Sequence, residues 1–208
     1  MKILSLYAGG YAANTYYVST DDKMTGIIVD PAVSPSELYS TLGYRPEITA
    51  IVLTHAHFDH MLTLDEWRNE TGAPLYLGKG DAKGLLDADR NLFYTFFREN
   101  RTFFPAERLL VEGDAIHVGG ETLTVLETPG HTAGSIVLVG GGIMLTGDTV
   151  FAFGDVGRTD FPSGNAAVLA ESLLKLCRID GEYTLYPGHG PTTTLRKEAA
   201  IHRIDRKI

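Results

Sequence analysis

Short segments in which apolar and polar residues alternate, or in which apolar β-branched residues run together, follow one another along most of the chain. Both patterns are typical of β-strands, with one face or both faces buried. Turn-forming residues separate the segments: Asp30-Pro31 ends one of them, because proline cannot donate to a strand ladder, and Gly119-Gly120 suits a hairpin turn. The expected strands are 2–7, 16–19, 26–30, 48–53, 74–77, 115–118, 121–127, 135–139, 143–145 and 184–186.

Four segments have the helical spacing of apolar residues instead. The first of them begins at Ser34-Pro35, where a serine can cap the first free amides and proline fits the first turn. Strands that alternate with helices in this way favour an α/β fold. The expected helices are 34–42, a segment from Leu62 through Trp67, 165–177 and 198–206.

Residues 88–107 differ in kind, because six or more aromatic side chains are interleaved there with charged ones. Aromatic stripes usually serve packing, so an amphipathic helix or loop on the core is one interpretation. A lid over the functional site, or a contact between two subunits of a homodimer, is the other. The aromatic residues are Phe93, Phe96, Phe97, Phe103, Phe104 and Tyr94.

The composition is that of an ordinary globular protein, with 208 residues, 44% hydrophobic and 21% charged. We expect one domain over residues 1–208. The net charge of -8, with no basic run except 203–207, argues against nucleic acid as a partner, and no run approaches the ~18 apolar residues of a membrane span. The single cysteine, Cys177, excludes an internal disulfide and fits the cytoplasm.

Candidate metal ligands are concentrated in the run Thr54-His55-Ala56-His57-Phe58-Asp59-His60, where four of six consecutive residues from position 55 can bind a metal. The apolar segment before it predicts a buried strand that ends at the carboxyl edge of a sheet, where α/β folds place their sites. Strand alternation would direct His55 and His57 the same way, and a tight turn would bring Asp59 and His60 round. The run therefore predicts two pairs of ligands.

The same arrangement recurs three more times: a strand, a sharp turn rich in glycine or proline, and then an imidazole or a carboxylate. It places His131, Asp148 and His189 at strand ends. A single histidine beside a glycine is commonly structural. Four such ends that meet on one rim are not explained by core packing, because a core would leave the polar groups unpaired.

These motifs, in this order and spacing, resemble those of the metallo-β-lactamase superfamily, and more narrowly the small single-domain hydrolases of the glyoxalase II (hydroxyacylglutathione hydrolase) branch. The resemblance spans almost the whole chain and implies an αββα sandwich of two mixed β-sheets flanked by helices. Its motifs are Asn14-Thr15-Tyr16, residues 55–60, Thr128-Pro129-Gly130-His131, Gly147-Asp148-Thr149, Gly157-Arg158-Thr159-Asp160 and Pro187-Gly188-His189-Gly190.

The resemblance also implies a ligand set for two divalent ions. His55, His57 and His131 would hold the first ion, Asp59, His60 and His189 the second, and Asp148 would bridge both. Imidazoles and carboxylates without a thiolate suit zinc, which we expect, and also iron or manganese. Three protein ligands and a bridge at each ion leave room for a shared water, as in catalytic sites.

A hydrolytic mechanism follows from these charges. A water shared by two divalent ions should ionise near neutral pH, and the hydroxide would attack a carbonyl while the ions stabilise the oxyanion. Asp59 would then take the proton. A thioester is a fitting small-molecule substrate because a thiol, with a pKa near ~8.5, leaves without strong protonation. The resemblance points to S-D-lactoylglutathione or a related hydroxyacyl thioester.

The chain departs from the family in two respects. Met61-Leu62 follows His60 where small residues are usual, so we expect a more distant helix start and a more apolar pocket. The glutathione-binding helical domain of the longer glyoxalase II enzymes also lies beyond the matched region. Candidate substrate contacts are Arg158, Phe93 and Phe97, although Arg158 could equally be a loop anchor paired with Asp160.

Several other functions use the same framework. Persulfide dioxygenases of the superfamily hold one iron at the positions of His55, His131 and Asp148, and lactonases share the hydrolytic site. A β-lactamase is disfavoured because Asp148 stands where those zinc enzymes commonly have cysteine, and a ribonuclease would need a basic surface. The remaining histidines, His117 and His202, are expected at the surface.

Overall fold

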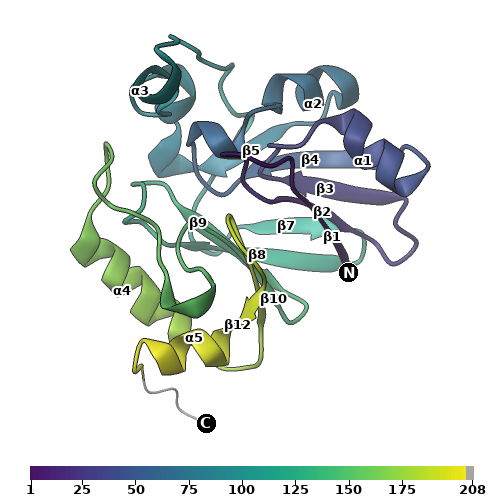
Figure 1. Ribbon diagram of the computed structural model, residues 1–208. Coiled ribbons are helices and arrows are strands. Elements are labelled where there is room, and N and C mark those ends of the chain that lie inside the picture. Colours follow the sequence, from purple (N-terminus) through teal and green to yellow (C-terminus); the bar gives the residue numbers. More distant parts are fainter. Residues whose placement is uncertain (205–208) are drawn as a thin grey trace.

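The computed structural model describes residues 1–204, which fold into two six-stranded β-sheets packed face to face between two layers of helices (Figure 1). The αββα architecture expected from the sequence is confirmed. Within the described residues, none of the helices is both long enough and apolar enough to cross a lipid bilayer.

The first sheet has the strand order β1-β2-β3-β4-β5-β6, antiparallel over its first three strands and parallel from β3 to β6. The central strands β2 and β3 and the second half of β4 are its most deeply buried part. Because β3 to β6 run in one direction, their carboxyl ends meet at one edge. The strands are β1 (Lys2–Leu6), β2 (Thr15–Ser19), β3 (Thr25–Val29), β4 (Glu47–Leu53), β5 (Leu75–Gly78) and β6 (Arg108–Leu110).

The second sheet has the order β12-β11-β10-β9-β8-β7 and is antiparallel except between β10 and β11. Both sheets are therefore mixed. The predicted strands are found with boundaries shifted by one or two residues. The strands are β7 (Ala115–Val118), β8 (Glu121–Glu127), β9 (Ile136–Gly140), β10 (Ile143–Gly147), β11 (Thr184–Pro187) and β12 (Thr193–Thr194).

Helices cover the outer face of each sheet (Figure 1). Ser34 caps the first helix as predicted, accepting a hydrogen bond from the Glu37 amide. The last helix begins three residues earlier than expected and ends at Ile201, since its side chains pack on the sheet from Leu195; positions 205–206 of the prediction lie outside the described residues. The α-helices are α1 (Pro35–Leu42), α2 (Leu64–Thr71), α3 (Phe93–Phe97), α4 (Ala166–Cys177) and α5 (Leu195–Ile201), and the 3₁₀ turns are η1 (Phe58–His60), η2 (Lys79–Asp81), η3 (Gly84–Leu86) and η4 (Ala152–Gly154).

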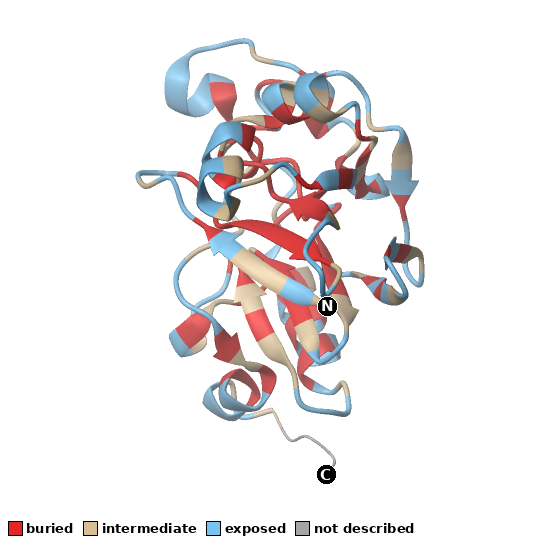
Figure 2. Cartoon of the chain, turned by 90° about the vertical axis from the view of Figure 1, so that its right-hand side faces the viewer, coloured by how far each residue is buried: buried red, intermediate tan, exposed pale blue. Residues whose placement is uncertain are grey.

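Three apolar layers hold this arrangement together, and Figure 2 shows the buried strands between helices that expose their outer faces. Successive residues of a strand point to opposite faces of the sheet. Ile27 and Val29 therefore point into the layer between the sheets, whereas Ile28 packs beneath α1 and α2. The third layer lies between the second sheet and α4 and α5, and Cys177 is buried in it. The strand ends at the shared edge of the sheets are thereby fixed in position.

Candidate metal centre

The loop after β4 places four potential ligands at the edge of the first sheet. His55 lies in a bend directly after the strand and His57 is extended, and the 3₁₀ turn η1 then reverses the chain so that Asp59 and His60 point back toward them. His55, His57 and His60 are almost completely buried. The two pairs expected from the sequence are therefore adjacent in the structure.

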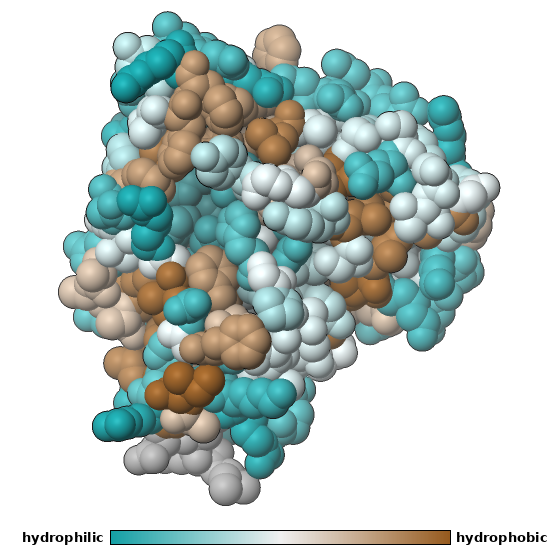
Figure 3. Space-filling model, viewed as in Figure 1, coloured by the Kyte–Doolittle hydropathy of each residue, from teal (hydrophilic) through white to brown (hydrophobic). Residues whose placement is uncertain are grey.

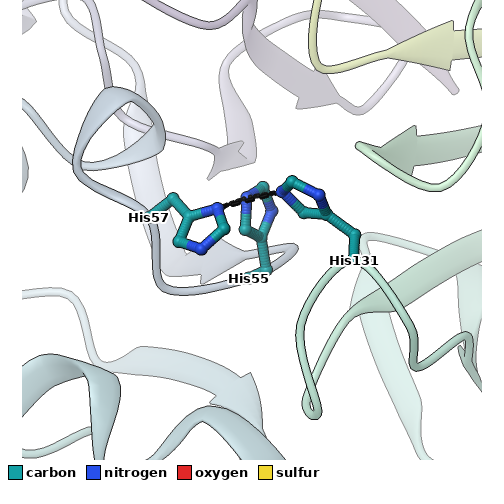
Figure 4. Close-up of side chains that lie close together, drawn as sticks. All are labelled: His55, His57 and His131. Carbon is teal, nitrogen blue, oxygen red and sulfur yellow. Dashed lines mark hydrogen bonds between the residues drawn. The ribbon is translucent and has the colours of Figure 1, made fainter. Parts of the chain in front are cut away.

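His131, from the loop after β8, completes a cluster of three imidazoles (Figure 4). The distances are 3.1 Å from His55 Nε2 to His57 Nδ1, 2.9 Å from His57 Nδ1 to His131 Nε2, and 3.2 Å from His131 Nε2 to His55 Nε2. His131 Nδ1 lies 2.7 Å from the carbonyl oxygen of Arg158, so it must donate, and Nε2 keeps its lone pair. Nitrogen lone pairs that lie so close together repel one another, and a cation bound between them would stabilise the arrangement.

A second cluster contains Asp59, His60 and His189, the last supplied by the turn after β11. His189 Nε2 lies 3.1 Å from Asp59 Oδ2. Asp148, which follows β10, lies between the clusters: its Oδ1 is 3.2 Å from His60 Nε2, and its Oδ2 is 3.6 Å from His131 Nε2 and 3.7 Å from His189 Nε2. The structure thus brings together all seven residues that the sequence nominated as ligands.

Buried polar atoms without a hydrogen bond lie among these residues. His57 Nε2, His60 Nε2 and Asp148 Oδ1 are inaccessible to solvent and make no hydrogen bond to any of the described residues, and the last two face each other as an ion pair at 3.2 Å. Leaving such atoms unsatisfied costs about 1–3 kcal/mol each. A Cβ atom on Gly188 would lie 2.1 Å from Asp148 Oδ1, so the chain keeps this space clear with a glycine. The donor set and the unsatisfied atoms both fit divalent ions.

The electrostatics divide the histidines into two kinds. Burial, reinforced by the neighbouring imidazoles, lowers the pKa of His57 to about 3 and the pKa of His55 well below its usual value, so both rings are neutral at pH 7 and have lone pairs to offer. Burial alone would also lower the pKa of His60, but the carboxylates of Asp30 and Asp148 raise it. Despite its burial, Asp148 has a pKa well below the usual range because of His60.

Asp30 supports the second cluster, a role that sequence analysis missed because it assigned Asp30 only to the end of a strand. Its buried carboxylate accepts hydrogen bonds from the amide and hydroxyl of Thr54, each 2.8 Å long, and lies 2.9 Å from His60 Nδ1. Asp30 also has a left-handed backbone, with φ of 53°. The sequence feature that could have indicated this role is the position of Asp30 directly after β3, because β3 pairs in parallel with β4, the strand that leads to the ligand run.

Asp81 supports the first cluster and was also missed. Its buried carboxylate accepts hydrogen bonds from the amide of Ala56 (2.9 Å), the hydroxyl of Thr132 (2.7 Å) and the amide of Gly134 (2.8 Å). Ala56 lies between two of the histidines and Thr132 follows His131. One side chain therefore joins the two loops that supply the first cluster.

The loop of His189 is held by the Asn14-Thr15-Tyr16 segment. Asn14 Nδ2 donates to the carbonyl oxygens of Pro187 and Gly190, each at 3.0 Å, and the Tyr16 hydroxyl donates to Pro187 O at 2.6 Å. A segment of the first sheet thus fixes a ligand loop of the second.

A cavity of about 440 Å³ opens over the two clusters. Arg158 lines it and is also the predicted loop anchor, because its guanidinium makes two hydrogen bonds to Asp160. Phe93 and Phe97, the other expected substrate contacts, do not line the cavity. The lining residues are Tyr11, His57, Phe58, Asp59, Leu92, Phe96, His131, Asp148, Phe151, Val156, Gly157, Arg158, Phe161 and His189.

Part of the aromatic segment packs in the core, and part of it borders the cavity. Phe93 and Phe103 are buried in the core, whereas Phe96 and Phe104 are exposed, and Phe96 forms part of the cavity wall. Met61 is fully buried in the core and does not line the cavity, and α2 starts only at Leu64.

The expected surface position of His117 is confirmed, and His202 is half-buried at the end of α5.

Comparison with known proteins supplies a family for this arrangement. A family model described as the metallo-beta-lactamase superfamily matches residues 8–189. The probable metallo-hydrolase YqgX of Bacillus subtilis is 35% identical over 205 residues, which cover 95% of this chain and 94% of YqgX. The hydroxyacylglutathione hydrolase GloC of Haemophilus influenzae is 28% identical over 183 residues, which cover 86% of each chain.

Solved structures are similar over the same length. The BLEG-1 B3 metallo-beta-lactamase matches with a TM-score of 0.88 and 29% identity, covering 96% of this chain and 97% of that chain. TTHA1623 in a di-iron-bound form matches with a TM-score of 0.78 and 32% identity, with the same coverage.

Proposed function

The chain belongs to the metallo-β-lactamase superfamily and is a metal-dependent hydrolase, and from this premise we propose that it holds two divalent ions and hydrolyses a thioester. In the reaction, the oxygen of water bonds to the carbonyl carbon, the C–S bond breaks, and the products are a carboxylic acid and a thiol. A hydroxyacyl thioester such as S-D-lactoylglutathione is the reference substrate, in keeping with the name of GloC, a hydroxyacylglutathione hydrolase.

His55, His57 and His131 would hold one ion, Asp59, His60 and His189 the other, and Asp148 would contact both. When bound, such ions supply a water that ionises near neutral pH and a Lewis acid for the carbonyl oxygen. Zinc suits the donor set best, and the di-iron form of TTHA1623 makes iron the first alternative.

In the proposed reaction, residues of the chain itself accept one proton and hold another in place. Asp59 Oδ2 borders the cavity and receives a hydrogen bond from His189, so it is placed to take the proton that the attacking water releases. The carbonyl of Arg158 keeps the proton of His131 on Nδ1. The aromatic residues of the cavity wall exclude bulk water from the reacting groups.

The observation that carries the thioester proposal is the absence of a spare acid. Every carboxyl and imidazole group of the described cavity lining is already assigned to the two clusters, and the one placed to carry a proton, Asp59, receives it from the attacking water, so the lining holds no separate acid for the leaving group. A thiolate, with a thiol pKa of roughly 8.5, leaves without such an acid, whereas an alkoxide leaves with difficulty. Thioesters therefore fit this site better than esters or lactones.

A mono-iron persulfide dioxygenase would need only the positions of His55, His131 and Asp148. Asp59, His60 and His189 form a second cluster whose potential ligand atoms also all lie within 4.8 Å of one another, which favours two ions and hydrolysis. A lactonase would use the same ions, and this alternative differs only in the bond that breaks.

Metal analysis combined with a substrate panel tests the proposal. Protein loaded with zinc, iron or manganese would be assayed on S-D-lactoylglutathione, simple acyl thioesters, lactones and glutathione persulfide. We expect close to two ions per chain and thioester cleavage. Oxygen consumption with persulfide in the iron-loaded protein, or cleavage of lactones alone, would overturn the proposal.

A further inference from the structure

The cavity has an aromatic wall built from separate parts of the chain. Tyr11 comes from the loop before β2, Phe58 from η1, Phe96 from α3 and Phe161 from the loop before α4. Their rings form a continuous series, with centroid distances of 5.9 Å from Tyr11 to Phe96, 4.9 Å from Phe96 to Phe58 and 6.0 Å from Phe96 to Phe161. Phe161 in turn lies 5.8 Å from the ring of His57, so the wall reaches the first cluster.

The outer part of this wall is open to solvent. Tyr11 is 66% exposed and Phe96 is 40% exposed, although both contact other rings. Figure 3 shows hydrophobic residues gathered over the α3 region beside a hollow with hydrophilic residues at its floor. Exposed aromatic faces beside a cavity mark a surface that an apolar group can cover.

The cavity offers little to a charged substrate. Among the described residues that line the cavity, Arg158 is the only charged one outside the two clusters. Its guanidinium is engaged by Asp160 through two hydrogen bonds of 2.7 and 2.6 Å and stacks on the ring of Phe161 at 3.9 Å. A bidentate carboxylate partner offsets the charge of the cation and uses two of its five N–H donors, which makes it less available to a substrate carboxylate. Glutathione, with two carboxylates and an ammonium group, therefore meets only this one compensated cation in the described lining outside the two clusters.

We propose that this site prefers thioesters that carry an uncharged, apolar alkyl or aryl group over glutathione thioesters. Tyr11 and Phe96 determine this preference. The inference rests on the proposed thioester hydrolysis and narrows it to a substrate class. The apolar group can belong to the acyl half or to the thiol half, since both flank the carbonyl that the clusters face.

Two substrate series distinguish these halves. The first varies the acyl group from acetyl to hexanoyl and phenylacetyl on one uncharged thiol, N-acetylcysteamine. The second keeps the acetyl group and varies the thiol from N-acetylcysteamine to hexanethiol and benzyl thiol, with S-acetylglutathione and S-D-lactoylglutathione for reference. We expect kcat/KM to rise in at least one series by roughly two- to fourfold for each methylene buried, and the best apolar substrate to exceed both glutathione thioesters.

Variants then test the assignment to Tyr11 and Phe96. Tyr11→Ala and Phe96→Ala should flatten the dependence on chain length, with the loss of kcat/KM largest on the longest apolar substrate and smallest on the acetyl thioester of N-acetylcysteamine. Phe104→Ala is the matched control, because Phe104 is a neighbouring exposed phenylalanine outside the cavity. It should retain the full dependence on chain length.

The outcomes are separable from those of the proposed function. A rate that is flat in both series, or highest with a glutathione thioester, overturns this inference but leaves thioester hydrolysis standing. An unchanged chain-length dependence in both alanine variants overturns the role of Tyr11 and Phe96. Failure to cleave any thioester overturns the inference together with the proposed function.

Discussion

The Oδ2 atom of Asp30 lies 2.9 Å from the Nδ1 atom of His60, and this contact determines which nitrogen of His60 faces Asp148. An ionised carboxylate can only accept, so the proton stays on Nδ1 and the ring presents Nε2 to the second cluster. The same carboxylate receives two hydrogen bonds from Thr54, next to His55. Asp30 therefore orients residues at both ends of the ligand run.

Replacing Asp30 with asparagine should weaken the second metal site most. An amide offers one acceptor oxygen instead of two, so one of the Thr54 bonds or the His60 contact is lost. We expect affinity for the second ion to fall by about 10- to 100-fold and the free energy of unfolding to fall by about 1–3 kcal/mol. Metal titration and urea denaturation measure these effects. Asp89→Asn, an exposed carboxylate, is the control, and unchanged affinity in Asp30→Asn would refute the role.

Replacing Asp81 with asparagine should act on the first site instead. Its partners Ala56 and Thr132 adjoin the histidines of the first cluster, and the asparagine loses one acceptor among three buried donors. We expect weaker binding of the first ion, by about 10- to 100-fold, with the second site less affected. Stepwise metal titration of Asp81→Asn and Asp30→Asn side by side gives the comparison. Identical profiles for the two variants would contradict it.

Removing a ligand should abolish turnover. His57→Ala deletes one of three converging nitrogens, and Asp148→Asn deletes a negative charge shared by both clusters. We expect activity to fall by on the order of 100-fold or more and the metal content to fall with it. Chelation of the unmodified protein should have the same effect, reversed by adding zinc. His117→Ala serves as the control because His117 is exposed. Full activity in stoichiometrically metal-free protein would disprove metal dependence.

The hydroxyl of Tyr16 should make the fold sensitive to alkaline pH. Burial raises the pKa of Tyr16 above its usual value of about 10, so the folded state holds this proton more tightly than the unfolded state does. The resulting stability is complete below pH ~10 and declines as pH rises toward the folded pKa. Tyr16→Phe also removes the hydrogen bond to Pro187, which should lower the free energy of unfolding by about 1 kcal/mol at pH 8.

The difference between Tyr16→Phe and the unmodified protein should therefore shrink or reverse at pH 11. Urea denaturation at both pH values measures it. Tyr7→Phe, at a residue 58% exposed, controls for ordinary tyrosine ionisation. An equal difference at pH 8 and pH 11 would show that Tyr16 ionises no less easily in the folded state.

The layers of the fold and the seven clustered residues were predictable because both depend on short, local patterns. Alternating apolar residues mark which face of a strand is buried, and a polar residue after such a strand falls at the sheet edge. The two-residue strand β12 was not predicted because it is too short to show a period. The residues that form the cavity wall were also not identified correctly. Helix α3 has five residues between left-handed Leu92 and Arg98, so spacing could not tell that Phe96 faces the cavity.

Asp30 and Asp81 were missed for a different reason. Their partners are backbone amides and side chains that lie 24–30 residues away for Asp30 and 25–53 residues away for Asp81, and no local pattern relates an acceptor to such donors. Only the pairing of β3 with β4, and of β4 with β5, brings them beside the ligand loop.

Each cluster takes two side chains from the loop after β4, in the first sheet, and one from a loop of the second sheet. Neither half of the polypeptide can assemble a complete site by itself. A chain still under synthesis must release Asp148 from the ribosome before the first set of donors is complete, and His189 before the second set is complete, and in both cases the two sheets must dock. Complete metal binding would therefore require the docked sheets, and the bound ions would join residues of both sheets.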